Sequence, residues 1–289
     1  MRAVLATCAL AVLLGGQARA AEGEAVTFPS VDWSGAVRAY VSASLFRPAA
    51  PGRHPAVVIL HGCGGVRASS AQWGEWLAAN GMVALALDSF GPRGLSNVCG
   101  NPPDRAFLDL LIGLVEDSFS AASFLAARPE VDRTRIAAMG FSLGGHIVRR
   151  LGGEDARSYA PRSAPQFRAL LPFYPGGCGI AGRDVRRIAV PMLILHGELD
   201  DWTPAAPCRE AAARARARGE PVDIVVYSAA HHGFDQVDRP LTFLADVASI
   251  TPERRMGVHI GGNTVARDAA RLDVLRFLRA NLAPDRPPQ

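Results

Sequence analysis

The sequence lacks a long apolar run of the kind that crosses a membrane. The apolar segment at its start, residues 3–14, is too short for a bilayer-spanning helix. It follows Arg2 and precedes Ala18-Arg19-Ala20, a small-x-small cleavage site. We therefore expect residues 1–20 to be an export signal cleaved after Ala20, which gives a periplasmic or secreted protein without a membrane anchor.

A strong net charge of either sign is also lacking. The 31 basic and 27 acidic side chains give a formal charge of +4, and loss of the signal, with its two arginines and no acid, lowers this to +2. Arginine takes the place of lysine, and the basic residues form no long stripe. Because nucleic-acid-binding proteins usually carry such a stripe, we expect no nucleic-acid partner.

Cysteines at zinc-binding spacing are absent, and no C-x-x-C occurs, so we expect no metal site. An even number of cysteines remains after the signal leaves, which in an oxidising compartment predicts two disulfides with three alternative pairings. We favour Cys63–Cys99 and Cys178–Cys208, because each pair would join loops at the same end of the expected sheet.

Short apolar runs alternate with helical stretches along the mature chain of about 270 residues. This alternation predicts one α/β domain over residues 21–284, with a mostly parallel central sheet and helices on both faces. We expect a monomer and a frayed polar tail at residues 285–289. The expected strands are residues 37–46, 56–60, 82–87, 135–139, 169–173, 192–195 and 222–227, and the expected helices are residues 72–80, 105–127, 204–218 and 265–282.

The most informative motif is Gly140-Phe141-Ser142-Leu143-Gly144, a G-x-S-x-G sequence. An apolar strand precedes it, and residues 145–151 can continue as a helix. Strand, sharp turn and helix form the context of a nucleophile elbow, in which glycines flank a serine held in a strained turn. A glycine-rich turn without chemistry is the alternative, and the residues considered next favour Ser142 as a nucleophile.

A serine nucleophile needs a histidine base, and the histidine needs an acid to orient it. Three carboxylates follow the strand at residues 192–195, where a loop can reach the ligand crevice of the sheet. We favour Asp200 as the acid. Asp201 is better explained as a helix-start carboxylate before Pro204, and Glu198 as a solvated loop acid.

The candidate base lies in the loop after the strand at residues 222–227. His231 and His232 are adjacent, so both cannot face the serine. We favour His232, because Gly233 lets the loop fold closely over the site, and His231 remains the alternative. Of the other histidines, His146 is expected to pack inside the protein. His61 and His196 are expected to bond to loop backbone, and His54 and His259 to lie at the surface.

Acyl transfer also needs N–H donors for an oxyanion. The first expected donor is the backbone of Leu143, directly after the nucleophile. The second is expected in the glycine-rich loop at residues 61–65, where we nominate the N–H of Cys63. A plain glycine-rich turn is the alternative for this loop.

Together with residues 88–94, these motifs resemble the α/β-hydrolase superfamily and, more narrowly, the dienelactone hydrolase family, in the order that family shows. The resemblance implies hydrolysis of small esters or lactones without a cofactor. The best-known members have a cysteine where this chain has Ser142. Arg93 lies where it can meet an anionic substrate, with a structural loop arginine as the alternative. Pocket walls are expected from residues 97–105 and 152–167.

These observations predict an exported serine hydrolase that cleaves carboxylic esters or lactones through an acyl-enzyme. Two alternatives stay open. A peptidase of the same fold often carries a large gating domain, for which this chain has little room. A catalytically silent binding protein would not need the complete set of Ser142, Asp200 and His232.

Overall fold

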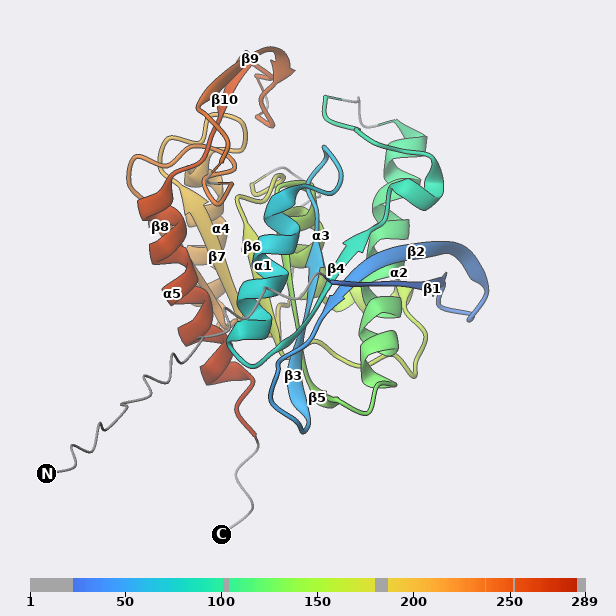
Figure 1. Ribbon diagram of the computed structural model, residues 1–289. Helices are drawn as coiled ribbons and strands as arrows, with labels where there is room; N and C mark the ends of the chain where they lie inside the picture. The colour runs from blue at the N-terminus through green and yellow to red at the C-terminus, as the bar shows by residue number, and fades with distance from the viewer. Residues whose placement is uncertain (1–22, 101–103, 180–186, 237, 252, 285–289) are drawn as a thin grey trace, which may run out of the picture.

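The structure is a computed structural model that describes residues 23–100, 104–179, 187–236, 238–251 and 253–284. The expected export signal and the tail at residues 285–289 lie outside these ranges. Figure 1 shows a central sheet between helices, with a small hairpin standing at one end. The predicted α/β architecture with a mostly parallel sheet is confirmed.

Within the described ranges the central sheet has eight strands in the order β1-β2-β4-β3-β5-β6-β7-β8. The pairs β1–β2 and β2–β4 are antiparallel, and the pairs from β4 to β8 are parallel. The inner strands are near-continuous apolar runs, as strands covered on both faces should be. The strands are β1 (Glu24–Val31), β2 (Val37–Phe46), β3 (His54–Leu60), β4 (Val83–Asp88), β5 (Val131–Phe141), β6 (Ala169–Phe173), β7 (Met192–Gly197) and β8 (Val222–Tyr227).

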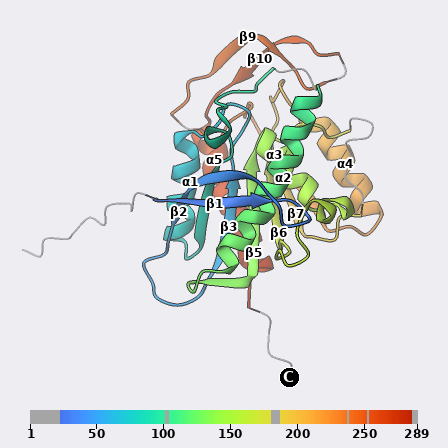
Figure 2. The same cartoon turned by 90° about the vertical axis from the view of Figure 1, so that its right-hand side faces the viewer.

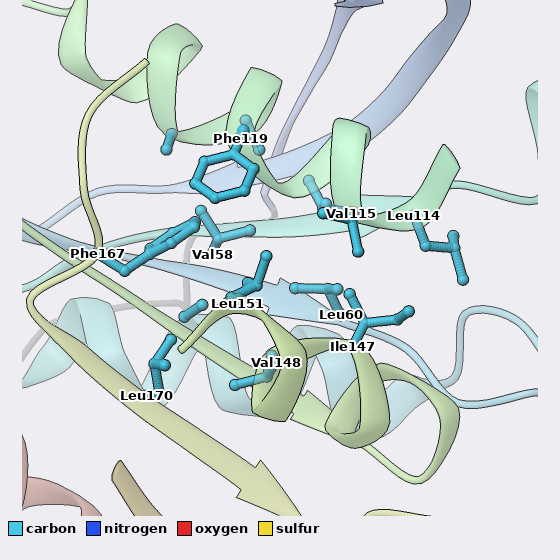
Figure 3. Packing of buried hydrophobic residues seen from close by; sticks show 14 of the residues in the cluster. Val58, Leu60, Leu114, Val115, Phe119, Ile147, Val148, Leu151, Phe167 and Leu170 are labelled. Atoms are coloured by element: carbon cyan, nitrogen blue, oxygen red, sulfur yellow. The ribbon is translucent and has the colours of Figure 1, made fainter. Parts of the chain in front are cut away.

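Helices cover both faces of the sheet and bury a separate core on each (Figure 2). Side chains of α2, α3 and α4 fill one core, and those of α1 and α5 fill the other. Figure 3 shows Phe119 of α2 and Leu151 of α3 packed around Val58 of β3. The helices are α1 (Ala68–Ala79), α2 (Arg105–Ala126), α3 (Leu143–Leu151), α4 (Ala205–Ala217) and α5 (Thr264–Asn281), with short 3-10 turns η1 (Gly91–Arg93) and η2 (Glu154–Tyr159).

Every strand and helix expected from the sequence is present, with ends that differ by a few residues. The apolar pattern does not predict β1, an edge strand with few buried residues, or the hairpin of β9 (Thr242–Ala248) and β10 (Met256–Ile260). The two hairpin strands pair with each other, with one further bridge from Ile260 to His232, and no residue of β9 is fully buried, so its sequence carries little alternation. None of the helices in these ranges combines the length and apolarity needed to cross a bilayer.

Candidate active site

Ser142 lies in a strained turn between the end of β5 and the start of α3. Its φ of 54° is in the left-handed region that side chains rarely adopt. The turn is held because the Ser142 N–H donates to the Phe173 carbonyl oxygen at 3.0 Å. A Cβ at Gly144 would lie 2.5 Å from the carbonyl oxygen of Leu60, and one at Gly145 would lie 2.5 Å from that of Phe173. The glycines therefore allow the close approach that keeps the serine in this conformation.

The structure brings Ser142, His232 and Asp200 together. Nε2 of His232 lies 2.9 Å from Oγ of Ser142, and Nδ1 of His232 lies 2.9 Å from Oδ2 of Asp200. The three residues follow β5, β8 and β7, so they converge where these parallel strands end. His232 and Asp200 are buried, which keeps competing water away from their hydrogen bond.

Asp200 is fixed by several donors besides His232. Its Oδ1 accepts from the N–H groups of Trp202 and Thr203 at 3.0 and 2.8 Å, and its Oδ2 accepts from the Thr203 hydroxyl at 3.0 Å. Burial alone would raise the pKa of Asp200, but the His232 ring and these hydrogen bonds outweigh burial and lower the pKa below its ordinary value. The side chain is therefore a carboxylate that can stabilise a charged His232.

The alternative residues have other partners. Asp201 Oδ2 lies 2.7 Å from Nδ1 of His259, while exposed Glu198 accepts from the Ala229 N–H at 3.4 Å. The ring of His231 lies beside that of His259, with 5.5 Å between the centroids. This arrangement favours Asp200 and His232 over Asp201, Glu198 and His231.

Two aromatic rings flank His232, and the sequence reasoning assigned a role to neither. The Tyr174 and Trp202 ring centroids lie 4.6 and 4.7 Å from the His232 centroid. The Tyr174 hydroxyl donates to buried Asp235, which also accepts from the Trp73 indole N–H at 3.1 Å. Tyr174 directly follows β6, and Trp202 directly follows Asp200 and Asp201 at the same edge of the sheet. These positions in the sequence could have indicated that both residues lie beside the site.

Other strand-end histidines are bound to backbone. Nδ1 of His61 lies 2.8 Å from the Gly62 carbonyl oxygen, and Nδ1 of His196 lies 3.3 Å from that of Gly197. Burial lowers the pKa of His196 to about 4. His196 is therefore neutral near neutral pH and adds no positive charge beside Asp200.

The two nominated oxyanion donors lie beside the serine. Leu143 directly follows Ser142 at the start of α3. Cys63 lines the same cavity as Ser142, and a Cβ at the preceding Gly62 would lie 3.5 Å from the Cβ of Ser142. Within the described chain, neither the Leu143 N–H nor the Cys63 N–H has a protein acceptor. Both are therefore available to an oxygen bound next to Ser142.

Ser142 opens into a cavity of about 280 Å³. Leu244, Val247 and Ile260 of the β9–β10 hairpin form one wall, and Asn97 and Cys99 contribute to another. Asn97 and Cys99 thus confirm part of the cavity wall that was expected from residues 97–105. The expectation for residues 152–167 is wrong, because none of them lines this cavity in the structure. The β9–β10 hairpin forms a wall of the cavity instead.

The arginines differ in their placement. Arg93 does not line the cavity: its guanidinium binds both carboxylate oxygens of buried Asp117 at 2.8 and 2.9 Å, which favours the structural alternative. Arg67 and Arg239 do line the cavity, and neither has a carboxylate partner among the described residues. Burial and the nearby charge of Arg67 lower the pKa of Arg239. One end of the cavity is therefore positively charged.

Both favoured disulfides, Cys63–Cys99 and Cys178–Cys208, are present. In the ranges that the structure describes, no three His, Cys, Asp or Glu side chains are grouped to hold a metal ion.

A mostly parallel sheet that carries a serine elbow, with an acid and a histidine at the ends of later strands, defines the α/β-hydrolase class. The model of the dienelactone hydrolase family matches residues 41–282, and the chain belongs to this family.

Solved structures of similar fold include a dienelactone hydrolase-like promiscuous phosphotriesterase from metagenomic libraries. It has a TM-score of 0.63 and 18% identity over 90% of this chain and 100% of the other. A thermophilic esterase of Thermogutta terrifontis, solved with propionate bound, has a TM-score of 0.62 and 20% identity over 91% of this chain and 97% of the other. At these identities the likeness shows a shared fold.

Among curated proteins, the cutinase est1 of Thermobifida alba is 28% identical over 163 residues, which are 56% of this chain and 48% of the cutinase. The chain thus spans about half the length of that relative. A probable 2-oxo-3-(5-oxofuran-2-ylidene)propanoate lactonase of Bradyrhizobium sp is 24% identical over 199 residues, which are 67% of this chain and 79% of the lactonase.

Proposed function

We propose that the protein is an exported serine hydrolase that cleaves carboxylic esters or lactones through an acyl-enzyme on Ser142. The observation that carries this proposal is the hydrogen-bonded series from Asp200 through His232 to Ser142, with 2.9 Å at each step. Its members have the three roles of nucleophile, base and orienting acid that acyl transfer requires.

The reaction begins when Nε2 of His232 takes the hydroxyl proton as Ser142 Oγ attacks the acyl carbon. The carbonyl oxygen gains negative charge and accepts hydrogen bonds from the N–H groups of Leu143 and Cys63. His232 then gives the proton to the leaving alkoxide, and the C–O bond breaks to leave a serine ester. In the second half, His232 takes a proton from water as the water oxygen attacks the serine ester. The bond from the acyl carbon to Ser142 Oγ then breaks as His232 gives that proton to Oγ, which releases the acid and free Ser142.

Asp200 acts through His232 in both halves. It accepts a hydrogen bond from the Nδ1–H, which leaves Nε2 free to act as base, and it stabilises the imidazolium that forms in each transition state. The flanking rings of Tyr174 and Trp202 hold the imidazole plane in place. No cofactor takes part in this scheme.

The substrate class is inferred from the relatives and from the cavity. The names of the cutinases and of the lactonase refer to ester and lactone cleavage, and another structure of the Thermogutta terrifontis esterase is described as phosphorylated by paraoxon. The positive end of the cavity, with Arg67 and Arg239, favours a substrate that carries an anionic group. We therefore place acidic esters and lactones first among the substrates.

The proposal also covers the cellular compartment, the domain organisation and the oligomeric state. Two disulfides support maturation in an oxidising compartment, in agreement with the expected signal cleavage after Ala20 and a periplasmic or secreted product. We propose a single hydrolase domain over residues 21–284 that acts as a monomer, needs no metal, and has neither a nucleic-acid nor a membrane partner.

An activity panel tests the proposal. Purified wild type and Ser142→Ala are assayed with lactones, short-chain 4-nitrophenyl esters, aromatic esters and peptide anilides. The proposal expects wild type to cleave esters or lactones and Ser142→Ala to be inactive. Cleavage of anilides alone would indicate a peptidase, and a folded wild type without any activity would indicate a binding protein.

A further inference from the structure

We infer that the Cys63–Cys99 disulfide is a positioning element of the oxyanion hole, while Cys178–Cys208 serves stability alone. This inference rests on the proposed function, because it assigns a role within the acyl-transfer site. It assigns Cys99, which the reaction scheme above does not use, to the support of transition-state stabilisation.

The turn that carries Cys63 is built almost entirely from glycine. Gly62, Cys63, Gly64 and Gly65 form a tight turn, closed by the Gly65 N–H donating to the Gly62 carbonyl oxygen at 3.1 Å. Cys63 is the one residue of these four with a side chain. Glycine-rich backbone has many accessible conformations, so the turn has little of its own to fix the direction of the Cys63 N–H.

The segment after residue 96 holds Cys63 at two points. Its Sγ is bonded to Cys99, and its carbonyl oxygen accepts from the Val98 N–H at 2.8 Å. Fixing the side chain and the carbonyl of one residue restricts its backbone dihedral angles and hence the direction of its N–H. That N–H has no acceptor among the described residues, and Cys63 lines the cavity.

This segment is itself anchored to the protein core. The side chain of Val98 is buried in the core on the α2 and α3 face, and the Cys99 N–H donates to Oδ1 of Asn97 at 2.8 Å. The disulfide thus connects the oxyanion turn to the protein core rather than to a loose loop. A shift of one ångström in a catalytic donor can reduce turnover by roughly 100-fold. An anchor that prevents such a shift therefore affects the rate.

The Cys63–Cys99 disulfide also contacts residues on other sides of the cavity. Cys63 and Cys99 pack against the cluster of Trp202, Val258 and Ile260, and the Trp202 ring contacts the His232 ring. The crosslink therefore lies between the oxyanion turn, the β9–β10 hairpin and the catalytic base.

The chain offers a matched control. The Cys178–Cys208 disulfide spans 30 residues and the Cys63–Cys99 disulfide spans 36, so in the chain-entropy description both stabilise the fold about equally. Cys178 and Cys208 belong to the buried core and do not line the catalytic cavity. A purely structural role would make the two crosslinks equivalent in every assay.

The experiment compares wild type, Cys63→Ala/Cys99→Ala, Cys99→Ala and Cys178→Ala/Cys208→Ala. All are assayed with one 4-nitrophenyl ester, well below the lowest melting temperature among them. We expect loss of the first disulfide to lower kcat by roughly 10-fold to 100-fold with KM changed by less than about threefold. Inhibition by a trifluoromethyl ketone, which forms a tetrahedral oxyanion on Ser142, should weaken by a similar factor. Cys178→Ala/Cys208→Ala should match wild type in both measurements. Cys99→Ala keeps the Cys63 side chain, so it gives the same test if the double variant fails to fold.

Equal losses of kcat in the two disulfide variants, an unchanged kcat after loss of Cys63–Cys99, or a change confined to KM would overturn the inference and leave the proposed function standing. A wild type that hydrolyses no ester would overturn the proposed function, and this inference with it.

Discussion

Asp201 and His259 form a carboxylate–imidazole pair that is separate from the proposed catalytic residues. Oδ2 of Asp201 lies 2.7 Å from Nδ1 of His259, and Oδ1 accepts from the His259 backbone N–H at 2.8 Å. Both side chains are partly exposed, at 43% and 40%. The carboxylate one residue earlier, Asp200, is buried and faces His232. Neighbouring acids thus serve different histidines, because successive loop residues point in different directions.

This difference gives a direct prediction for the acid. Asp200→Asn should reduce kcat by roughly 10⁴-fold with little change in fold, because an amide favours the wrong histidine tautomer. Asp201→Asn is the matched control and should stay within about threefold of wild type, since an exposed pair contributes little. Steady-state kinetics with one ester decide the matter, and the reverse pattern would show that Asp201 is the catalytic acid.

The positive end of the cavity predicts substrate preference. Arg67→Gln/Arg239→Gln should lower the ratio of kcat/KM for mono-4-nitrophenyl succinate to that for 4-nitrophenyl butyrate by roughly 10-fold to 100-fold, because hydrogen bonds to charged groups contribute about 1.5–3 kcal/mol. Arg38→Gln/Arg105→Gln removes the same charge from exposed positions away from the cavity and should leave the ratio unchanged. A ratio that is equal in all three proteins would rule out the anionic preference.

Arg93 should matter for stability rather than for substrate binding. Its partner Asp117 is fully buried, so Arg93→Gln leaves a charge without its partner and should lower the free energy of unfolding by about 3–5 kcal/mol. Arg105→Gln breaks the exposed pair with Asp109 and should cost at most about 1 kcal/mol. Urea unfolding measures both. A stable Arg93→Gln variant with a raised KM for anionic esters would instead make Arg93 a substrate ligand.

Stability in acid should depend on Glu130, which accepts hydrogen bonds from Arg128 and Arg47. Burial would raise the pKa of Glu130, but these arginines outweigh it, and the pKa falls from 4.5 to about 2. A lowered pKa means that the carboxylate stabilises the fold fully above pH 4.5 and progressively less as the pH falls toward 2.

Glu130→Gln should therefore lose less unfolding free energy than wild type across that pH interval, as measured by urea unfolding at a series of pH values. Glu75→Gln on α1 is the control, because Glu75 makes no ion pair within the described residues. The unfolding free energy of this variant should change with pH as that of wild type does. Parallel curves for Glu130→Gln and wild type would contradict the assignment.

The sequence was informative where a short pattern has one structural explanation. Buried parallel strands are continuous apolar runs, and the crowded turn at Ser142 requires glycines, so both could be predicted. Tyr174 and the pocket arginines could not, because their roles come from strands and loops that meet only in the folded chain. The sequence left Arg93 open between a substrate contact and a structural loop arginine, because its buried partner Asp117 is distant in sequence. The hairpin was missed because its strands bury little apolar surface of their own.

The central claim is that Ser142 is an activated nucleophile, and covalent labelling tests it most directly. Folded wild type is treated with a fluorophosphonate, and the adduct is located by peptide mass mapping. We expect one adduct on Ser142 of wild type and none on Ser142→Ala. A folded wild type that stays unlabelled, or a Ser142→Ala variant that is labelled equally well, would contradict it.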